Sequence, residues 1–587
     1  MNTLAKIRRI FTPTEQRKAM SMLALVVLMA LAETAGVISI MPFLSVLGRP
    51  AIIEENSALR ALYHYFDFTS ARAFTVALGL ASIAIVVSSA AFKTVTLHLL
   101  NRFVHLARHS IGSRLLACYL RQPYAFFLTH HPSLLEKNIL SETDLLVFNL
   151  IQPLSQLLAQ GAVVLAMVVL ILCYDPAMAL CIVLALSLLY GTIYWLVRKR
   201  LERIGNERQE ANGRRYQSCN EALGGIKEVK VTRSAAAWVQ KFSAPSRLFA
   251  RHMAAAETLA QSPLYIVEAT GYTGLIVIAL LLLLRTSDVA HVLPALGLYG
   301  FAAYRMLPAV QIMYRGFARL KFSAATLETI HNGLMLPDET AAPTAAPLAP
   351  QREIRLERIC YAYPATPDTP VLRDFDLVIE AGSSVGITGK SGAGKSTLMD
   401  ILLGLLQPQG GSLRVDGVPV TAENVASWQR AIGYVPQHIY LRDADVLENI
   451  AFGIPRAEID RQAVERATRV AQIHDFIDSE LPDGYKTRLG DRGIRLSGGQ
   501  RQRIGIARAL YCDPPVLFMD EATSALDTET EEAVNEAIRG LSGHKTIVVI
   551  AHREASLRDC QQIVFLCPNG NSACQQLPNP LVIPMRR

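Results

Sequence analysis

Long uninterrupted runs of hydrophobic residues fill the first half of the chain and are absent from the second half. A run must reach about 20 residues to cross the hydrocarbon core of a bilayer as a helix. Six runs reach that length and predict six transmembrane helices. They lie at approximately 19–47, 73–100, 145–174, 177–197, 264–284 and 289–314.

The positions of lysine and arginine predict how these helices are oriented. The two short connections, between the third and fourth runs and between the fifth and sixth, carry one such residue, Arg285. Because basic residues mark the cytoplasmic face, both termini are expected inside. No cleavable leader is expected at the basic N-terminus. The basic residues after the second and fourth runs are Arg102, Arg108, Arg114, Arg121, Arg198, Lys199, Arg200, Arg203, Arg214 and Arg215.

The connections on the two faces differ in character. The long inner connections are polar and contain few helix breakers, so the spanning helices are expected to continue into the cytoplasm. Outside, ENSALRALYHYF carries Leu59, Leu62, Tyr63 and Phe66 at three- and four-residue spacing. That spacing predicts a short amphipathic helix. It lies either at the outer membrane surface or as a simple turn packed on the spans.

A change of composition divides the chain. Residues 337–351, PDETAAPTAAPLAPQ, are rich in proline and alanine and indicate a linker. Beyond it, short β-branched strands alternate with amphipathic helices, which is typical of an α/β domain. We therefore predict a membrane domain at 1–336, a linker at 337–351 and a soluble domain at 352–587.

Composition and charge fit this division. The 587 residues are 51% hydrophobic and 18% charged, whereas soluble domains carry about a quarter charged residues. The net charge of +8 gathers beside the apolar runs, so membrane topology explains it better than a nucleic-acid partner does. The nine cysteines form no CxxC pair and no metal-like spacing with histidine, so they are expected to be packing residues.

The stretch SVGITGKSGAGKST predicts a buried strand, a glycine loop and a helix start. It fits G-x-x-x-x-G-K-[ST], in which backbone amides and a helix N-terminus surround phosphate oxygens. Lys395 is expected to reach the β- and γ-phosphates, and Ser396 to hold Mg²⁺. The predicted phosphate-binding residues are Gly389, Lys390, Ser391, Gly392, Ala393, Gly394, Lys395, Ser396 and Thr397.

Two carboxylates follow a second buried strand. In PPVLFMDEATSALD an apolar run ends at Asp520 and Glu521. A carboxylate at that strand end is placed to hold the water shell of a metal. The next carboxylate is placed to polarise an attacking water. The alternative, a surface acidic pair, does not explain the apolar run before it.

A second candidate anion site lies in RLSGGQRQRIGIARAL. Ser497, Gly498, Gly499 and Gln500 open a helix whose first amides face outward. One phosphate chain does not need two cradles in one subunit. This site is therefore predicted to serve a nucleotide held by a second subunit.

These motifs together resemble the ATP-binding-cassette (ABC) half-transporters of the exporter type, over nearly the whole chain. The resemblance implies an all-α polytopic membrane domain with six transmembrane helices and an α/β P-loop cassette. It implies a domain-swapped dimer with ATP between the P-loop of one subunit and LSGGQ of the other. Tyr363 matches the adenine-stacking residue, although a core tyrosine is the alternative. Gln437 matches the residue at Mg²⁺ and water, Asp527 an interface residue, His552 the γ-phosphate contact, and Glu521 the catalytic base.

The same resemblance implies further features. No motif is degenerate, which favours a homodimer with two competent ATP sites. Coupling helices are expected near 121–132 and 216–232, with ordinary loops as the alternative. Residues 560–577 predict the last hairpin with its turn at Asn569 and Gly570, after which the usual closing helix is missing.

Three charged residues inside predicted spans are candidates for function. Glu33 falls near the midplane of the first, Lys93 late in the second, and Arg305 in the inner-leaflet half of the sixth, shortly before Pro308. Charges in hydrocarbon are costly and commonly functional, so these three are predicted to bind substrate. The alternatives are a structural pair between Glu33 and Arg305, and a snorkelling Lys93.

The first and sixth spans look similar to those of bacterial lipid-linked oligosaccharide flippases. The shared features are E-x-x-G followed by P-F, an outer amphipathic helix, and arginine before L-P. By this resemblance Arg305 binds the pyrophosphate of a polyprenyl-linked glycan, in the inner membrane of a bacterium. One departure is Leu264 after Pro263, where that group often has arginine. Export of another lipid, drug or peptide is the alternative, and an ATP-gated channel is a remote one.

Overall fold

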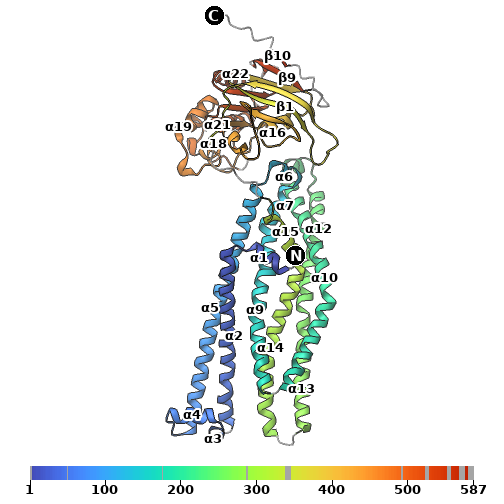
Figure 1. Ribbon diagram of the computed structural model, residues 1–587, viewed down its shortest axis with the longest axis vertical. Helices are drawn as coiled ribbons and strands as arrows, with labels where there is room; N and C mark the ends of the chain where they lie inside the picture. The colour runs from blue at the N-terminus through green and yellow to red at the C-terminus, as the bar shows by residue number, and fades with distance from the viewer. Residues whose placement is uncertain are drawn as a thin grey trace. The chain divides into compact units, whose positions relative to one another are not determined.

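A computed structural model describes most of the chain, which forms two compact units (Figure 1). The membrane unit comprises 1–120 and 130–337, and the cassette unit comprises 121–129 and 338–587. The described residues are 3–48, 50–174, 176–285, 289–337, 346–490, 493–522, 526, 528–551, 557–558, 560–566 and 576–578.

Long helices form the membrane unit, and each predicted span lies on one helical path (Figure 1). The helices that carry the spans are α2 (Pro13–Gly48), α5 (Ala71–Leu120), α9 (Gln152–Tyr174), α10 (Pro176–Gly224), α13 (Pro263–Arg285) and α14 (Val289–Phe322). The shorter or connecting helices are α1 (Thr3–Ile10), α3 (Ile52–Glu55), α4 (Ser57–Tyr65), α7 (Pro132–Lys137), α8 (Thr143–Leu146), α11 (Ile226–Val231), α12 (Ala235–Gln261) and α15 (Ala324–Leu334).

By length and composition, three described helical stretches are able to cross a membrane. They are Pro13–Gly48, Ala71–Leu120 and Pro132–Val169. The 50 residues of α5 extend about 75 Å at 1.5 Å per residue, more than twice the hydrocarbon thickness of about 30 Å. The long polar end of this helix therefore continues well beyond a membrane, as the polar inner connections predict.

Two π-helical turns interrupt the path that leads into α9. They are η1 (Asn138–Glu142) and η2 (Val147–Ile151), on either side of α8. A π turn holds one more residue than an α turn, so it shifts the phase of every residue that follows. The sequence contains no glycine or proline between 138 and 151, and these turns were not predicted.

The outer end of α2 and α5 carries the predicted short helix. Asn56 caps α4, because its side chain accepts hydrogen bonds from the amides of Ala58 and Leu59. Leu59 is buried in a cluster with Val46, Ile53 and Phe74. Leu62 and Phe66 are exposed, at 44% and 62%. One face of the helix is thus packed on the spans, while Leu62 and the capping residue Phe66 are exposed.

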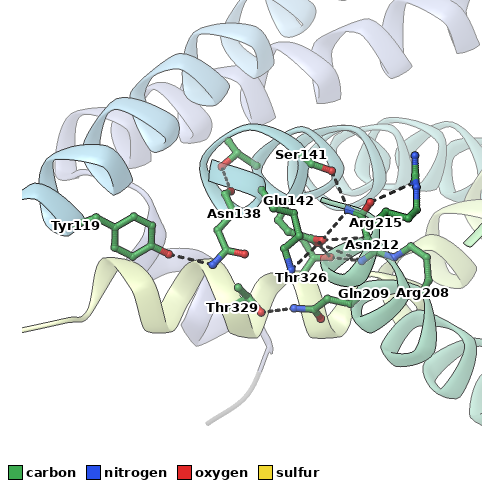
Figure 2. A network of polar contacts seen from close by, with 12 residues as sticks. Tyr119, Asn138, Ser141, Glu142, Arg208, Gln209, Asn212, Arg215, Thr326 and Thr329 are labelled. Carbon is green, nitrogen blue, oxygen red and sulfur yellow. Dashed lines mark hydrogen bonds and ion pairs between the residues drawn. The ribbon is translucent and has the colours of Figure 1, made fainter. Parts of the chain in front are cut away.

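A buried ion pair joins three helical segments of the membrane unit (Figure 2). Glu142 of η1 has 0% and Arg208 of α10 has 1% of its side chain exposed. Both Arg208 Nη atoms donate to the Glu142 carboxylate at 3.2 Å. Thr326 of α15 accepts from Arg208 and donates to Glu142, each at 2.8 Å. Asn212 donates to Ser141 at 3.0 Å and lies 3.4 Å from Glu142.

Lys137 adds a second positive charge beside this carboxylate. Its Nζ lies 3.9 Å from Glu142 Oε1, and 7% of the side chain is exposed. The network therefore holds one fully buried acid between two bases. Ionic groups this deeply buried are stable only when all partners are present.

The cassette unit is built on two sheets. In the described residues one sheet has the strand order β10-β9-β3-β8-β7-β6, with β9, β3, β8, β7 and β6 parallel. The other is antiparallel with the order β2-β1-β4-β5. The strands are β1 (Glu353–Tyr361), β2 (Leu372–Glu380), β3 (Ser384–Gly389), β4 (Gly410–Val415), β5 (Val418–Pro419), β6 (Ile432–Val435), β7 (Val516–Asp520), β8 (Thr546–Ile550), β9 (Gln562–Leu566) and β10 (Gln576–Pro578).

Helices complete this α/β unit, and β9 pairs with β10 antiparallel as the predicted hairpin requires. Asn569 and Gly570 lie outside the described residues, as do residues 579–587. Trp428 is fully buried and meets Phe518 edge-on at 6.4 Å between ring centroids. The helices are α6 (Tyr124–Thr129), α16 (Lys395–Leu402), α17 (Val425–Arg430), α18 (Val446–Ile450), η3 (Arg456–Glu458), α19 (Arg461–Val470), α20 (His474–Ser479), η4 (Gly484–Lys486), α21 (Gly498–Leu510) and α22 (Thr528–Arg539).

One helix of the cassette unit comes from the other half of the sequence. α6 falls in the first predicted coupling segment, and α11, in the membrane unit, falls in the second. Ala125 of α6 packs against the cassette core. Pro123, Tyr124 and Phe127 line a cavity of about 590 Å³ together with Tyr361 and other cassette residues. The aromatic residues of RQPYAFF thus contact the cassette within this unit.

We predict that breaking the buried ion pair destabilises the membrane unit strongly. Arg208→Met leaves Glu142 without its closest base, which is expected to cost about 3–5 kcal/mol of unfolding free energy. Thermal unfolding of the detergent-solubilised chain measures the loss. The matched control is Arg214→Met on the same helix, whose pair with Glu210 is 67% exposed on both sides. Its effect should stay near zero. An equal loss in the two variants would contradict the prediction.

Candidate active site

A glycine loop connects β3 to α16 and forms the centre of the site. Gly392 and Gly394 adopt positive φ angles of 80° and 96°, which favour glycine. A Cβ on Gly394 would also lie 2.9 Å from Val371 Cγ1. Gly394 is the N-cap of α16, and no side chain caps this helix. The first amides of α16 therefore face the loop, which suits an anion.

Lys395 is held across this loop. Its Nζ donates to the backbone carbonyls of Gly389, at 2.9 Å, and Lys390, at 3.1 Å. Only 8% of the residue is exposed. The ammonium group is thus desolvated and positioned by neutral acceptors rather than by a carboxylate. A phosphate oxygen entering the loop would therefore interact with the full positive charge of this ammonium group.

The end of β7 brings two carboxylates to the same place. Asp520 is the last residue of the strand, and Glu521 follows with a positive φ of 48°. The amide of Glu521 donates to the Ile550 carbonyl at 2.9 Å, which fixes this unusual backbone position. Gln437 Nε2 donates to Glu521 Oε2 at 2.8 Å. The predicted acid and the predicted glutamine are therefore direct neighbours.

These elements enclose a cavity of about 410 Å³. The cavity gathers residues from five separate stretches of sequence, so the structure brings most of the predicted site together. The lining residues are Tyr363, Val371, Ser391, Gly392, Gly394, Lys395, Ser396, Thr397, Gln437, Asp520, Glu521 and Ile550.

Tyr363 stands at the edge of this cavity rather than in the core of a strand. It lies beyond β1, and its hydroxyl is 2.9 Å from Thr397 Oγ1. Its ring meets Tyr361 edge-on at a centroid distance of 5.3 Å. One face of a half-buried ring beside a phosphate loop suits stacking with a nucleotide base.

The SGGQ residues start α21 and do not line this cavity in the described part of the cassette. Ser497 and Gln500 form a capping box, in which each side chain accepts from the other residue's amide. Gly498 and Gly499 occupy the first helical turn, where amides have no partner within the helix. The helix start is therefore capped and lies outside the lining of this cavity.

Two predicted residues cannot be placed. Asp527 and His552 lie outside the described residues. Asp527 directly precedes α22, and His552 follows β8 by two positions. The ends of β7 and β8 are adjacent, since Asp520 pairs with Ile550.

The donors in the cavity fit Mg²⁺. This ion prefers oxygen ligands and is commonly held by one or two carboxylates, waters and substrate phosphates. Ser396, Gln437 and Asp520 supply a hydroxyl, an amide and a carboxylate to one cavity. Among the described residues no cluster of three or more His, Cys, Asp or Glu side chains is placed to bind a metal. A metal held partly by the nucleotide needs none.

Asp400 is a further acidic group that the sequence did not identify. It lies one helical turn beyond Ser396 on α16, on the same face. Burial raises the pKa of Asp400 to about 6, and the charge of Asp520 contributes in the same direction. Burial and the charges of Asp520, Asp400 and Tyr124 likewise raise the pKa of Tyr434. In the sequence, the spacing of four residues after Ser396 was the signal that could have identified Asp400.

Two of the three charged residues predicted to bind substrate form an ion pair with each other. Lys93 Nζ donates to Glu33 Oε1 at 2.8 Å and joins α5 to α2. Glu33 is 11% exposed and Lys93 is 41% exposed. Lys93 is therefore one structural partner of Glu33, and the considered pair between Glu33 and Arg305 stays a prediction. Arg305 lies in α14, and its side chain is outside the described residues.

The fold and this cavity together define a P-loop ATPase cassette on a polytopic helical domain. Comparisons with known proteins agree with that class. Residues 54–281 match the family model of the ABC transporter transmembrane region, and residues 372–524 match the family model described as ABC transporter. The chain belongs to the ABC transporters and is a half-transporter of the exporter type. It is a membrane protein whose ATPase is coupled to transport.

Relatives cover most of the chain. An ATP-dependent lipid A-core flippase of Alkalilimnicola ehrlichii is 32% identical over 76% of this chain and 75% of its own length. An ATP-dependent lipid A-core flippase of Ralstonia nicotianae is 30% identical over 76% of this chain and 75% of its own length. The structure of a bacterial Atm1-family ABC exporter with ATP bound superposes with a TM-score of 0.80, at 23% identity, over 97% of this chain and 96% of that one. The last comparison shows the fold.

We predict that Asp400 makes the cassette less stable as the pH rises. Its pKa of about 6 lies above its ordinary 3.8, so the folded state binds more protons between these values. Stability then falls from about pH 4 to about pH 6. Asp400→Asn should remove this slope in thermal unfolding of the full chain without nucleotide. Asp368→Asn, at an exposed position, is the control. A slope unchanged by Asp400→Asn would contradict the prediction.

Proposed function

We propose that this transporter uses ATP to flip a phosphate-bearing glycolipid from the cytoplasmic leaflet outward. The observation that carries the proposal is Arg305 within the apolar run of α14. A cation is rarely kept at that depth without an anionic partner. A lipid headgroup bearing phosphate supplies such a partner. The resemblance to lipid-linked oligosaccharide flippases and the lipid A-core flippase relatives support the same class of cargo.

For the chemistry we assign roles to the residues that line the 410 Å³ cavity. Lys395 and the loop amides bind the phosphates, and Tyr363 stacks on the adenine. Ser396, Asp520 and Gln437 hold Mg²⁺, which neutralises phosphate charge when bound. Glu521 polarises the attacking water. The hydrogen bond from Gln437 keeps the Glu521 carboxylate oriented until nucleotide enters.

Completion of the site requires a second subunit. Ser497, Gly498, Gly499 and Gln500 lie outside the cavity of their own subunit, so they are available to a partner's nucleotide. Asp527 and His552 are assigned to the interface and the γ-phosphate by family resemblance. Because every ATP-site motif of this chain is intact, two copies of the chain would form two competent ATP sites. We therefore propose a homodimer.

The cargo has two possible sources with the same chemistry. A polyprenyl-pyrophosphate-linked oligosaccharide and a lipid A-core molecule both join a glycan and phosphate to hydrocarbon. An Aspergillus fumigatus ABC multidrug transporter is 44% identical, but over only 38% of this chain. The similarity to that transporter supports drug export less than the longer matches support lipid flipping. Either glycolipid places the protein in the inner membrane of a bacterium, with both termini cytoplasmic.

The first test concerns hydrolysis. Glu521→Gln should lower ATP turnover of the purified dimer by about 100-fold or more while ATP still binds, because general-base catalysis contributes about that factor. Nucleotide binding is measured by equilibrium dialysis and turnover by phosphate release. The control is Glu423→Gln, at an exposed cassette position, which should leave turnover unchanged. Turnover that survives Glu521→Gln would exclude the assigned base.

The second test concerns the cargo. Arg305→Ala should leave basal ATP turnover intact and reduce flipping of the anionic lipid in proteoliposomes by about tenfold or more, because a buried charge-assisted contact is lost. Arg305→Lys should restore part of it. Parallel assays use undecaprenyl-pyrophosphate-linked oligosaccharide, lipid A-core and phosphatidylcholine. The control is Arg203→Ala, a position whose side chain is 81% exposed. Flipping unaffected by Arg305→Ala would reject the anion site.

A further inference from the structure

An apolar cavity of about 360 Å³ lies inside the membrane unit, apart from the nucleotide site. Its walls come from three span-bearing helices. α9 contributes Val164, α10 contributes Val183 and Gly191, and α14 contributes Met306 and Val310. The volume falls in the range of small-molecule sites, about 300–1,000 Å³. It suits part of a hydrocarbon chain and is too small for a whole glycolipid.

One polar group in this wall lacks a partner. Tyr190 is 8% exposed, and its hydroxyl has no hydrogen-bond partner among the described residues. Its neighbour Tyr314, 5.6 Å away between ring centroids, donates its hydroxyl to the Leu259 carbonyl at 3.2 Å. Buried hydroxyls are nearly always paired, and an unpaired one costs free energy. The Tyr190 hydroxyl therefore points to a ligand oxygen.

The position along α14 links this cavity to the proposed headgroup site. Met306, which lines the cavity, directly follows Arg305. Successive helical residues lie only about 1.5 Å apart along the axis. A cation in the sequence next to a residue that lines an apolar cavity matches the two halves of an amphiphile.

We propose that this cavity binds the first segment of the cargo's hydrocarbon chain. The hydroxyl of Tyr190 donates to the ester oxygen at the root of that chain, a carboxylic ester in lipid A or a phosphoester in a polyprenyl pyrophosphate. This inference rests on the proposed function, because it assigns the tail of the same cargo. Bulk phospholipid is the competing occupant, and the test separates it.

Gly191 offers a way to fill the cavity without disturbing its walls. A Cβ built on Gly191 would have no atom within 4 Å. Gly191→Leu therefore places a side chain in open space beside the cavity, and Gly191→Ala fills less of it. Gly274 of α13 also has no atom within 4 Å of a Cβ and does not line the cavity. Gly274→Leu is thus the matched control.

The test is photolabelling of the full-length protein in phosphatidylcholine nanodiscs, without nucleotide. The probes are lipid A with a diazirine in one acyl chain and undecaprenyl pyrophosphate with a diazirine near the phosphoester. Labelled peptides identified by mass spectrometry should come from the walls on α9, α10 and α14. Gly191→Leu should reduce this labelling about tenfold, Gly191→Ala less, and Gly274→Leu not at all.

Competition identifies the occupant. An excess of the unlabelled parent lipid should displace the probe, and an equal excess of phosphatidylcholine should not. Tyr190→Phe should weaken that competition about fivefold, as expected for one hydrogen bond. Labelling that persists in Gly191→Leu, or that phosphatidylcholine displaces equally well, would overturn the proposal. The probe that labels more strongly identifies the chain type.

The outcome is independent of the transport assays. Labelling needs neither ATP nor Arg305, so an inactive pump can still bind the chain. Specific labelling together with normal flipping by Arg305→Ala would reject the headgroup site and keep the cavity. Loss of specific labelling together with a flipping defect in Arg305→Ala would reject the cavity and keep the headgroup site. Basal ATP turnover of each glycine variant verifies that it has folded.

Discussion

A charge taken out of water must find a partner, and this constraint governs both units of the protein. In the membrane unit Glu142 and Arg208 hold three helical segments together, and Glu33 meets Lys93 across two others. In the cassette the Lys395 ammonium group donates to two backbone carbonyls. The paired charged side chains of the membrane unit are neutralised by each other. The Lys395 ammonium group is held by neutral carbonyls, so its charge remains available to an anion.

The sequence predicted those parts of the site that depend on local pattern. The glycine loop, the strand ending at Asp520 and the capped helix at Ser497 each follow from neighbours within a few residues. The six spans were likewise predicted from the length of the apolar runs alone. The buried pair was missed because Glu142 and Arg208 lie 66 residues apart. Asp400 was missed because its surroundings, not its spacing alone, raise its pKa.

Contact between the coupling segment and the cassette explains why the two halves of the sequence are not two independent units. Residues 121–129 cluster with the cassette, although they interrupt the membrane half. Their aromatic side chains share a cavity with Tyr361, whose ring touches that of Tyr363. The segment 121–129 is thus one ring contact away from Tyr363, the residue that we propose stacks on adenine.

The two π turns before α9 have a consequence for how this sequence can vary. Each inserts one residue beyond the α-helical repeat, so together they set the rotational phase of the whole span. Deleting one residue from either π turn would restore a regular α turn there and leave the residues after it facing as they do. Deleting one residue from the regular helix between 152 and 163 would instead turn Val164 by about 100° and out of the apolar cavity. The stretch 138–151 can therefore lose a residue where the regular helix after it cannot.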